Sequence, residues 1–404
     1  MYRQKTSSIA ALAAFCVTTG MLAACSSSTK DTGGNAASTI TIGNFSSATA
    51  GLIAPEVRGG AQAAVDSINA AGGIKGHHLK LSFCDTKTDP NQEVACARQM
   101  VKDKVAAVVD PQMFYSPSSL PILQKAGIAA LASQGITQNE FQTAVAFPLA
   151  GIPGWFYGAV AQLVKNGATK ISVIGVDNAS SKFANQTTLD AIKAAGLTPL
   201  HSISVDPTSS DYAPAAAQAV AGGTDGIVLT LSPESGPPAL KALHAAGYKG
   251  HIASITDVFP QQAVTAVGAD AEGMLLTSLL ALPDDMTNPS TAPFLADLAK
   301  YSSGTKANGF SYEAWAATQL FAKAVSGLDK YDSASVLAAL NNVDQIDLPA
   351  LGGYKIKGQT SPLPNLPRLL HTQVEQAIVK NGKIVDNGGS FDPFAFLADF
   401  KNKS

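Results

Sequence analysis

Several side chains that can hydrogen bond to a small solute follow apolar stretches of the chain, where strands are expected to end. Ser116, Thr137 and Asp257 supply hydroxyl and carboxylate groups, and Phe114 and Tyr115 add aromatic surface. A binding site needs converging donors and acceptors with an apolar wall. In open α/β sheets, ligands bind beyond the carboxyl ends of the strands. We therefore expect a solute site built from loops at residues 111–119, 133–137, 177–183, 232–236 and 256–260.

No pattern typical of catalysis or metal binding accompanies these groups. The sequence has no HExxH, GxSxG or P-loop pattern, and no GxGxxG directly after a strand. Its six histidines are scattered, and His77-His78 is expected to be a solvated pair in a turn. We expect no catalytic residue, no metal and no cofactor. An enzyme that has adopted a binding fold is a third class of function, which turnover of a bound solute would support.

The stretch from residue 68 to residue 89 shows the elements that must position these loops. Before it, apolar residues recur at spacings of three and four, as on one face of a helix. Gly72-Gly73 is expected to end that helix, because glycine adopts the left-handed conformation without a Cβ clash. Alternating apolar residues over 79–83 then predict a half-buried strand, and Pro90 suits the first turn of the next helix.

The remaining sequence alternates apolar strands with helices that end in glycine, which is typical of βαβ units on a parallel sheet. With 404 residues, 46% of them hydrophobic and 14% charged, the chain is too long for one core and suits two lobes. The predicted fold class is α/β, with a parallel sheet flanked by helices in each lobe. Strands are expected at 39–43, 79–83, 106–110, 128–132, 171–176, 226–231, 251–255, 274–282 and 369–375, with a hairpin over 379–385 that turns at Asn381-Gly382.

The first 24 residues are typical of an export signal. Arg3 and Lys5 precede a short apolar run that ends in small residues, a pattern of signal peptides rather than of membrane spans. The run Leu22-Ala-Ala-Cys25 resembles the lipobox of bacterial lipoproteins, which implies that Cys25 is the first mature residue and carries a lipid. The alternative is an ordinary export signal with an incidental cysteine. Residues 25–38 have the composition of a flexible tether.

The four cysteines divide according to position. Cys16 lies in the signal peptide and Cys25 in the lipobox, so Cys84 and Cys96 remain as an even pair in an exported chain. Such a pair favours a disulfide. Cys84 ends a predicted strand and Cys96 falls early in the following helix, so the two can meet if the helix packs on the sheet. The alternative is two buried thiols, and the spacing is poor for zinc.

Five segments together resemble the leucine/isoleucine/valine-binding protein family, the extracytoplasmic solute receptors of ABC importers with the type I periplasmic-binding fold. The resemblance covers nearly the whole mature chain, and the first two segments are the most specific. The segments are INAAGGIKGHHLKL (68–81), CDTKTDPNQEVACARQMV (84–101), AGIAAL (126–131), GADAEGML (268–275) and VKNGKIV (379–385).

This resemblance implies two lobes joined by three crossings, which close on a solute like a hinged clam. Lobe 1 would comprise residues 39–150 plus 284–356, and lobe 2 would comprise residues 151–283 plus 357–404. The crossings are expected near 149–153, 281–285 and 355–367.

The resemblance also assigns roles to individual residues. A serine-bearing loop of the family aligns with Phe114, Tyr115 and Ser116. The loop that binds the solute carboxylate through its backbone and a hydroxyl aligns with Gly135, Ile136 and Thr137. Two tyrosines of the family align with Phe183 and Ser232, and its amine-binding glutamate aligns within one position of Asp257. The two missing aromatic hydroxyls place a branched-chain amino acid in doubt.

Other readings of these residues stay open. Phe114 and Tyr115 can simply pack against Pro117, and Asp257 can cap the helix that follows it. Phe183 can be a plain hydrophobic lid. Tyr312 and Glu313 are carried over more weakly, from a late helix expected to approach the cleft.

The function that we expect is capture of a small amino-acid-like or carboxylate solute between two lobes, for delivery to an ABC permease. The protein would be a monomer, anchored by the lipid on Cys25 to the outer face of the bacterial cytoplasmic membrane. A formal net charge of -2 gives no argument for a nucleic-acid partner. The alternative is an amide or amino-acid sensor of the same fold that docks on a signalling partner.

Overall fold

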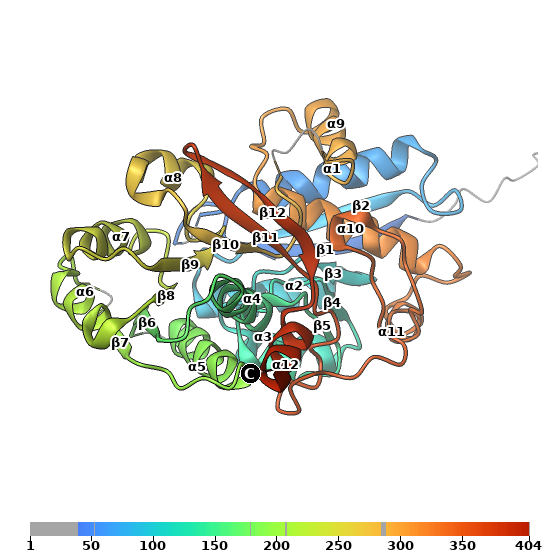
Figure 1. Cartoon of the computed structure of the whole chain (residues 1–404). Helices are drawn as coiled ribbons and strands as arrows, with labels where there is room; N and C mark the ends of the chain where they lie inside the picture. Colours follow the sequence, from blue (N-terminus) through green and yellow to red (C-terminus); the bar gives the residue numbers. More distant parts are fainter. Residues whose placement is uncertain (1–38, 52, 178, 207, 284–287, 404) are drawn as a thin grey trace, which may run out of the picture. The chain divides into compact units, whose positions relative to one another are not determined.

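The computed structural model describes residues 39–51, 53–177, 179–206, 208–283 and 288–403. The predicted signal peptide, the lipidation site Cys25 and the tether lie outside these residues. Two β-sheets form the framework (Figure 1). In spatial order, the first sheet contains β2 (Leu79–Asp85), β1 (Ile40–Ser46), β3 (Ala107–Val109), β4 (Ala129–Leu131) and β5 (Ala146–Phe147), all parallel.

The second sheet is mixed. Its five parallel strands are β10 (Leu275–Ser278), β9 (His251–Ile255), β8 (Gly226–Thr230), β6 (Ile171–Val176) and β7 (Ser202–Val205). At the β10 edge, β11 (Val374–Lys380) and β12 (Lys383–Phe391) add an antiparallel hairpin. The predicted α/β class with flanked sheets is confirmed, and the antiparallel hairpin makes the second sheet mixed rather than wholly parallel.

Helices surround both sheets. Those grouped with the first sheet are α1 (Glu56–Ala70), α2 (Pro90–Lys102), α3 (Ser116–Lys125), α9 (Ala292–Tyr301), α10 (Gly309–Val325) and α11 (Ser333–Asn341). Those grouped with the second are α4 (Gly151–Lys165), α5 (Ala179–Ala194), α6 (Ala213–Ala219), α7 (Gly236–Ala245), α8 (Gln261–Val267) and α12 (Pro393–Lys403). Short 3₁₀ helices are η1 (Gln138–Phe141), η2 (Ala221–Gly223), η3 (Gly268–Ala271) and η4 (Pro349–Leu351). Within the described residues, no helix combines the length and apolar character needed to cross a bilayer.

The chain passes three times between the two sheets. It leaves the first sheet after β5, returns after β10 to α9, and leaves again after η4 to reach β11. This connectivity is that of a two-lobed fold with three hinge crossings. The lobe boundaries that the sequence suggests stay a prediction.

Helix α4 is the most deeply buried helix of the second half, because all its residues from Gly151 to Val164 are buried. Two glycines allow the backbone to approach the sheet closely: a Cβ on Gly154 would meet Val374, and one on Gly158 would meet Thr277. Trp155 on this helix is 3% exposed. The position of α4 fixes the start of the second half relative to its own sheet.

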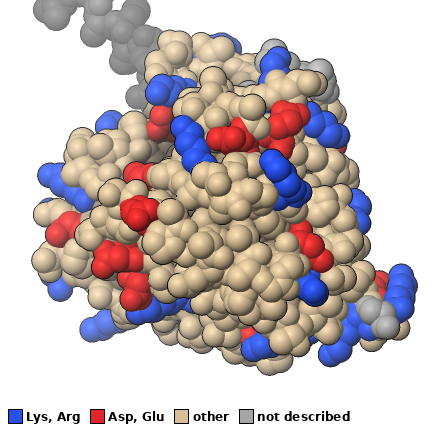
Figure 2. Space-filling model, turned by 60° about the vertical axis from the view of Figure 1, so that its left-hand side comes forward, with Lys and Arg blue, Asp and Glu red and all other residues tan. Residues whose placement is uncertain are grey.

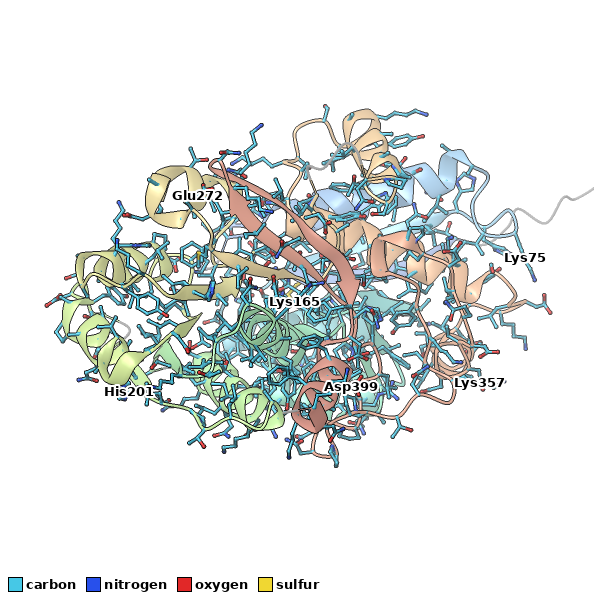
Figure 3. All side chains as sticks on the ribbon, viewed as in Figure 1. Lys75, Lys165, His201, Glu272, Lys357 and Asp399 are labelled. Atoms are coloured by element: carbon cyan, nitrogen blue, oxygen red, sulfur yellow. A yellow bond between two sulfur atoms is a disulfide. The ribbon has the colours of Figure 1, made fainter. Side chains whose placement is uncertain are left out.

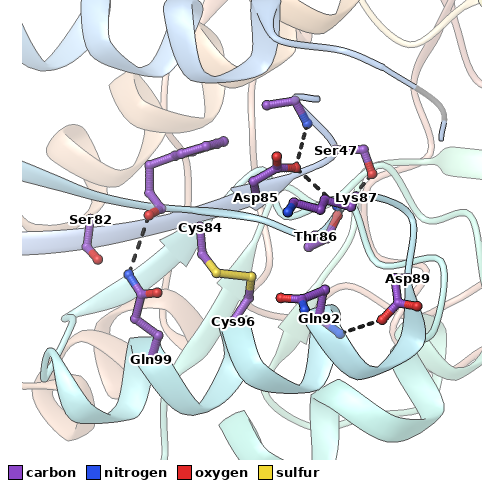
Figure 4. The surroundings of a disulfide bond; sticks show 12 residues. Ser47, Ser82, Cys84, Asp85, Thr86, Lys87, Asp89, Gln92, Cys96 and Gln99 are labelled. Atoms are coloured by element: carbon purple, nitrogen blue, oxygen red, sulfur yellow. Dashed lines mark hydrogen bonds between the residues drawn. A yellow bond between two sulfur atoms is a disulfide. The ribbon is translucent and has the colours of Figure 1, made fainter. Parts of the chain in front are cut away.

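The predicted disulfide between Cys84 and Cys96 is confirmed, and it joins β2 to α2 (Figure 4). Helix α2 starts at Pro90, as predicted, and Asp89 caps it by accepting hydrogen bonds from the backbone N–H groups of Asn91 and Gln92. The segment from β2 to α2, which carries part of the family resemblance, is therefore held by the Asp89 cap at the start of α2 and by the Cys84–Cys96 disulfide.

The predicted hairpin turn is also confirmed. Asn381 and Gly382 have φ angles of 54° and 70°, the left-handed values of a type I′ turn. Glu272, which Figure 3 labels beside this hairpin, accepts hydrogen bonds from the N–H groups of both residues at 2.9 and 3.2 Å. The side chain of a distant loop thus fixes the tip of the hairpin.

Some predicted elements differ from the structure. The strand expected at 369–375 begins only at Val374, because Leu369 and His371 are buried in a crossing segment rather than paired in a sheet. The strand expected at 274–282 ends at Ser278 for the same reason: residues 279–282 are buried without strand pairing. Strands β5 and β7 and helices α6 and α12 were not predicted, since they are short or lack a clear apolar period.

Candidate functional site

The carboxyl ends of β3 and β4 turn sharply, which aims the following loops away from the sheet. The residue after each strand has a left-handed backbone, with φ of 42° at Asp110 and 52° at Ala132. This conformation is uncommon for residues other than glycine. Asn44 on β1 supports the first turn, because its Nδ2 donates to the carbonyls of Val109 and Asp110. Strained backbone at strand ends is typical of functional sites.

A cavity of about 870 Å³ opens beside these loops. This volume is in the range of small-molecule sites. Four of the predicted site residues line it, and they come from elements of both halves: Phe114, Ile136 and Thr137 from first-sheet loops, and Phe183 from α5. The other lining residues are Pro117, Gln138, Asn139, Gln142, Tyr157, Lys182, Gln186, Thr187, Asp190, Leu363, Asn365 and Leu366.

The position of Phe183 corrects one expectation. Residues 177–183 were expected to be a loop, but α5 begins at Ala179, so Phe183 lies on a helix. Its ring lies 6.4 Å from that of Phe141, between ring centroids. The structure therefore brings Phe183 to the cavity from a regular element rather than from a loop.

Thr137 is hydrogen bonded within the protein. Its Oγ1 lies 2.5 Å from Oγ of Ser116, so these two predicted residues meet. Glu140 Oε1 accepts from the N–H of Ile136 at 3.0 Å, the N–H of Thr137 at 2.9 Å and the hydroxyl of Thr137 at 2.9 Å. These are the donors that the family resemblance assigned to the carboxylate of a solute. In this chain, the carboxylate of Glu140 already accepts hydrogen bonds from these donors.

Gly135 has a structural reason to be glycine. Its φ is 68°, and a Cβ there would meet the ring of Phe141 and the backbone of Gly151. Because any other residue would clash, the 135–137 loop keeps one path past the start of α4. This rigidity helps to hold Ile136 and Thr137 at the cavity.

Six predicted residues are not among those that line the cavity: Tyr115, Ser116, Gly135, Ser232, Asp257 and Tyr312. Tyr115 donates its hydroxyl to the carbonyl of Thr88 at 3.2 Å, toward the end of β2. Ser232 bonds to Ser235 at 3.1 Å, at the start of α7. Tyr312 is fully buried, donates to the carbonyl of Ser290 at 2.9 Å and packs against aromatic rings.

Asp257 belongs to a second group, formed by acids. Asp257 follows β9, Asp110 follows β3, and Glu313 is on the second turn of α10. Oδ1 of Asp257 and Oε1 of Glu313 lie 3.7 and 3.9 Å from the point where a Cβ of Gly309 would be. Gln134 donates to Glu313 at 2.6 Å. We call Asp110, Asp257 and Glu313 the acidic group.

The acidic group is poorly compensated. Burial raises the pKa of Asp110 well above its usual value, and Asp257 and Glu140 raise it further. Burial and the charges of Asp257 and Asp110 likewise raise the pKa of Glu313. Burial raises the pKa of Asp257 to about 6, although this residue keeps partial exposure. None of the ion pairs found among the described residues involves these three acids.

Exposed charged side chains on the surface are of both signs, unlike those of the acidic group. On the face in Figure 2, Lys and Arg side chains are interspersed with Asp and Glu. The acidic group contains acids alone, two of them after strands β3 and β9 and the third on helix α10. No set of three His, Cys, Asp or Glu side chains in the described part of the chain is arranged to hold a metal ion.

Sequence reasoning missed Asp110, Gln134 and Glu140. Asp110 ends the apolar strand sequence AAVVD, so an acid at the carboxyl end of a buried strand was a usable signal. Glu140 follows Thr137 by three residues, which is the spacing of a capping box. Gln134 had no comparable signal.

An α/β protein with two sheets, three crossings and a cavity between elements of both halves has the fold of a bilobed solute receptor. A sequence profile of the periplasmic binding protein family matches residues 39–363. The chain belongs to this family, and the predicted likeness to leucine/isoleucine/valine-binding proteins is confirmed. This is a family of substrate-binding receptors, so the expectation that the chain is not an enzyme is confirmed as well.

Individual relatives agree with this assignment. The chain is 26% identical over 328 residues to the Leu/Ile/Val-binding protein homolog 3 of Brucella melitensis, covering 75% of this chain and 85% of that protein. An extracellular ligand-binding receptor from Verminephrobacter eiseniae superposes with a TM-score of 0.75 at 18% identity, over 86% of this chain and 99% of the other. The branched-chain amino acid transporter substrate-binding protein LivJ from Streptococcus pneumoniae, solved in complex with isoleucine, gives 0.67 at 21% identity, over 86% and 97%. At these identities the two structures show the fold alone.

Proposed function

We propose that this protein is an extracytoplasmic solute-binding lipoprotein of an ABC importer, which holds a small amine-bearing solute of amino-acid size between its two halves and delivers it to a permease. The observation that carries the proposal is the cavity of about 870 Å³ lined by residues from elements of both halves. A solute that touches both halves stabilises the closed arrangement, which a permease can recognise. The names of the Brucella and Streptococcus proteins support amino-acid-like solutes as the first class to test.

The site residues in this proposal fall into two sets. Phe114, Ile136 and Phe183 supply apolar surface to the cavity, and Thr137 supplies a hydroxyl. Asp257, which belongs to the acidic group and is not among the residues that line this cavity, supplies a carboxylate for the amine of the solute. Roles for Tyr115, Ser116, Gly135, Ser232 and Tyr312 are supporting ones in this proposal, since they hold loops and helices rather than line the cavity.

A thermal-shift screen tests the binding step. The full-length protein is unfolded in guanidinium chloride and refolded to remove any bound solute, then heated with amino acids, amines, amides and small carboxylates. A binder at 100 times its Kd stabilises the protein by about 2.7 kcal/mol through mass action. A broad library in which no solute raises Tm, while a protein partner binds, would refute the receptor proposal.

Delivery and anchoring need separate measurements. Uptake of a radiolabelled binder in cells with and without this protein separates an importer subunit from a sensor, because a sensor changes signalling without changing uptake. Mass spectrometry of the mature N-terminus tests lipidation. An unmodified Cys25, or cleavage at another position, would exclude the lipid anchor.

A further inference from the structure

The acidic group brings three carboxyl groups together, more than the single amine of a neutral amino acid could pair with. Asp110 is fully buried and Glu313 is 4% exposed. Burying an ionised carboxylate without a partner costs several kcal/mol. The charged residues that raise these pKa values are all acids: Asp257 and Glu140 act on Asp110, and Asp257 and Asp110 act on Glu313. The described residues supply no cation to this group.

Unpartnered polar atoms at the same sheet edge point to a missing occupant. Both carboxylate oxygens of Asp110 lack a hydrogen-bond partner within the described residues, and so do Oε1 of Gln112 and Oγ of Ser46. All three side chains are at most 2% exposed. The N–H of Gln112 donates to the carbonyl of Phe45, which places Gln112 beside the end of β1. Buried polar groups are normally hydrogen bonded, so these atoms lack a polar partner that a ligand would provide.

Glu140 occupies the hydrogen-bond donors that would otherwise bind the carboxylate of a solute. The N–H groups of Ile136 and Thr137 and the hydroxyl of Thr137 already donate to Glu140 Oε1. A carboxylate from a solute would have to displace this buried side chain, which is 0% exposed. The donors of the 135–137 loop are therefore satisfied without a solute.

We propose that the solute is an organic cation with net positive charge, an amine or guanidinium compound, whose charged nitrogen groups are held by Asp110 and Glu313 together with Asp257, and which needs no carboxylate for recognition. This inference rests on the proposed receptor function and specifies its solute class. A zwitterion such as leucine adds one positive and one negative charge to a site that already lacks cations. A diamine adds two positive charges and no negative one, so it compensates more of the buried charge.

A matched pair of probes tests the charge requirement directly. Lysine and 1,5-diaminopentane differ only by the α-carboxylate, and leucine is the neutral reference. Isothermal titration of the refolded full-length protein is expected to show that 1,5-diaminopentane binds at least as tightly as lysine, and that both bind at least tenfold more tightly than leucine. Tighter binding of leucine than of either cation would overturn the proposal while leaving the receptor function intact.

Charge-neutralising substitutions test the residues. Asp110→Asn and Glu313→Gln keep the size of each side chain and are each expected to weaken binding of the tightest cationic probe by about 30-fold or more, because loss of one partner of a buried charge pair costs a few kcal/mol. The matched control is Asp399→Asn, the same chemical change at an exposed site on α12 (labelled in Figure 3). The control is expected to leave affinity unchanged. Equal affinities for all three variants would remove Asp110 and Glu313 from the site.

Gly309→Ala tests the position of the cation without changing charge. The new methyl group would lie 3.7 Å from Asp257 Oδ1 and 3.9 Å from Glu313 Oε1, with no clash. Gly309 is the first residue of α10, where alanine is a better helix former than glycine. We expect unchanged or higher Tm of the free protein but about tenfold weaker cation binding, since the methyl takes up the space between the two carboxylates. Unchanged affinity would show that the cation does not sit between them.

The outcomes separate this inference from the proposed function. Binding of a zwitterionic or anionic solute that is insensitive to Asp110→Asn refutes the cation and keeps the receptor. Binding of no small solute by protein that refolds with its native circular dichroism refutes both.

Discussion

Two sets of buried acids lie near the carboxyl edge of the first sheet, and they differ in how their oxygens are satisfied. Glu93 accepts from the N–H of Tyr115 at 2.9 Å and from the hydroxyl of Ser119 at 2.6 Å. Glu140 accepts three hydrogen bonds from the 136–137 segment. In the acidic group, by contrast, Gln134 to Glu313 and a long contact of Thr256 to Asp257 are the bonds found among the described residues.

This difference separates two roles for the same chemical group. Glu93 and Glu140 hold the loops that carry Phe114 and Thr137, so they build the site from within. The acidic group holds no element in a comparable way, and burial and neighbouring acids make Asp110 and Glu313 costly to ionise until a cation binds. Asp110 shows the difference most clearly, because both of its carboxylate oxygens are buried without a hydrogen-bond partner among the described residues, whereas Glu140 leaves one oxygen, Oε2, in that state and uses the other to hold its loop.

The largest expected effect is on the loop-building set. Glu140→Leu leaves the N–H groups of Ile136 and Thr137 buried without an acceptor, which is expected to lower the free energy of unfolding by about 3 kcal/mol. Urea unfolding of the ligand-free protein measures it. Glu140→Gln keeps an acceptor oxygen and should lose less. A cost for Glu140→Leu below 1 kcal/mol would contradict the structural role of this acid.

Neutralising substitutions in the acidic group should raise the stability of the ligand-free protein rather than lower it. The double variant Asp110→Asn/Glu313→Gln removes two buried acids that are costly to ionise and is expected to raise the free energy of unfolding of the ligand-free protein by about 1–2 kcal/mol at pH 7.5. The same urea experiment applies, with Asp399→Asn as the control. A loss of stability as large as that of Glu140→Leu would erase the distinction between the two sets.

Glu93 of the loop-building set, together with Glu375 on β11, should make the ligand-free protein less stable as pH rises from 6.5 to 8. The pKa of Glu93 is raised to about 7 and that of Glu375 to about 7, both mainly by burial, so the folded state still binds protons that the unfolded state has lost. Stability gained this way is present at low pH and is lost as pH passes the folded-state pKa values. The expected change is on the order of 1 kcal/mol. Below pH 6.5, His371 opposes the trend, because burial lowers its pKa to about 4.

The smallest effect is expected from Glu93→Gln. An amide can accept from the N–H of Tyr115 through its oxygen and donate to Ser119 through its nitrogen, so the change in stability should stay within about 1 kcal/mol. The pH dependence between 6.5 and 8 should become shallower, because one titrating group is gone. Thermal melts at four pH values measure it, and an unchanged slope would contradict the raised pKa of Glu93.

The sequence predicts the scaffold of this site better than its polar contacts. Helix ends, buried strands and the Asn381-Gly382 turn depend on local residue types, which is why α2, β6, β9 and the hairpin agree with expectation. The satisfaction of a carboxylate depends on distant residues. The capping-box spacing of Thr137 and Glu140 is a local signal for the bonds to Thr137, but no local feature shows that the same carboxylate also accepts from the N–H of Ile136. Tyr312 and Glu313 are neighbours on α10, yet one packs among aromatic rings and the other joins the acidic group, since adjacent helix positions face different directions.

The left-handed backbone at Asp110 has a consequence for how such a receptor can change its solute. Asparagine and glycine tolerate a φ of 42° at least as well as aspartate does. Both also remove the charge at this position. A single substitution can therefore relax the backbone and neutralise the site together, so a step from charged to uncharged solutes meets no stability barrier at this residue. Position 110 is for that reason the first to vary in a library designed to retune the receptor.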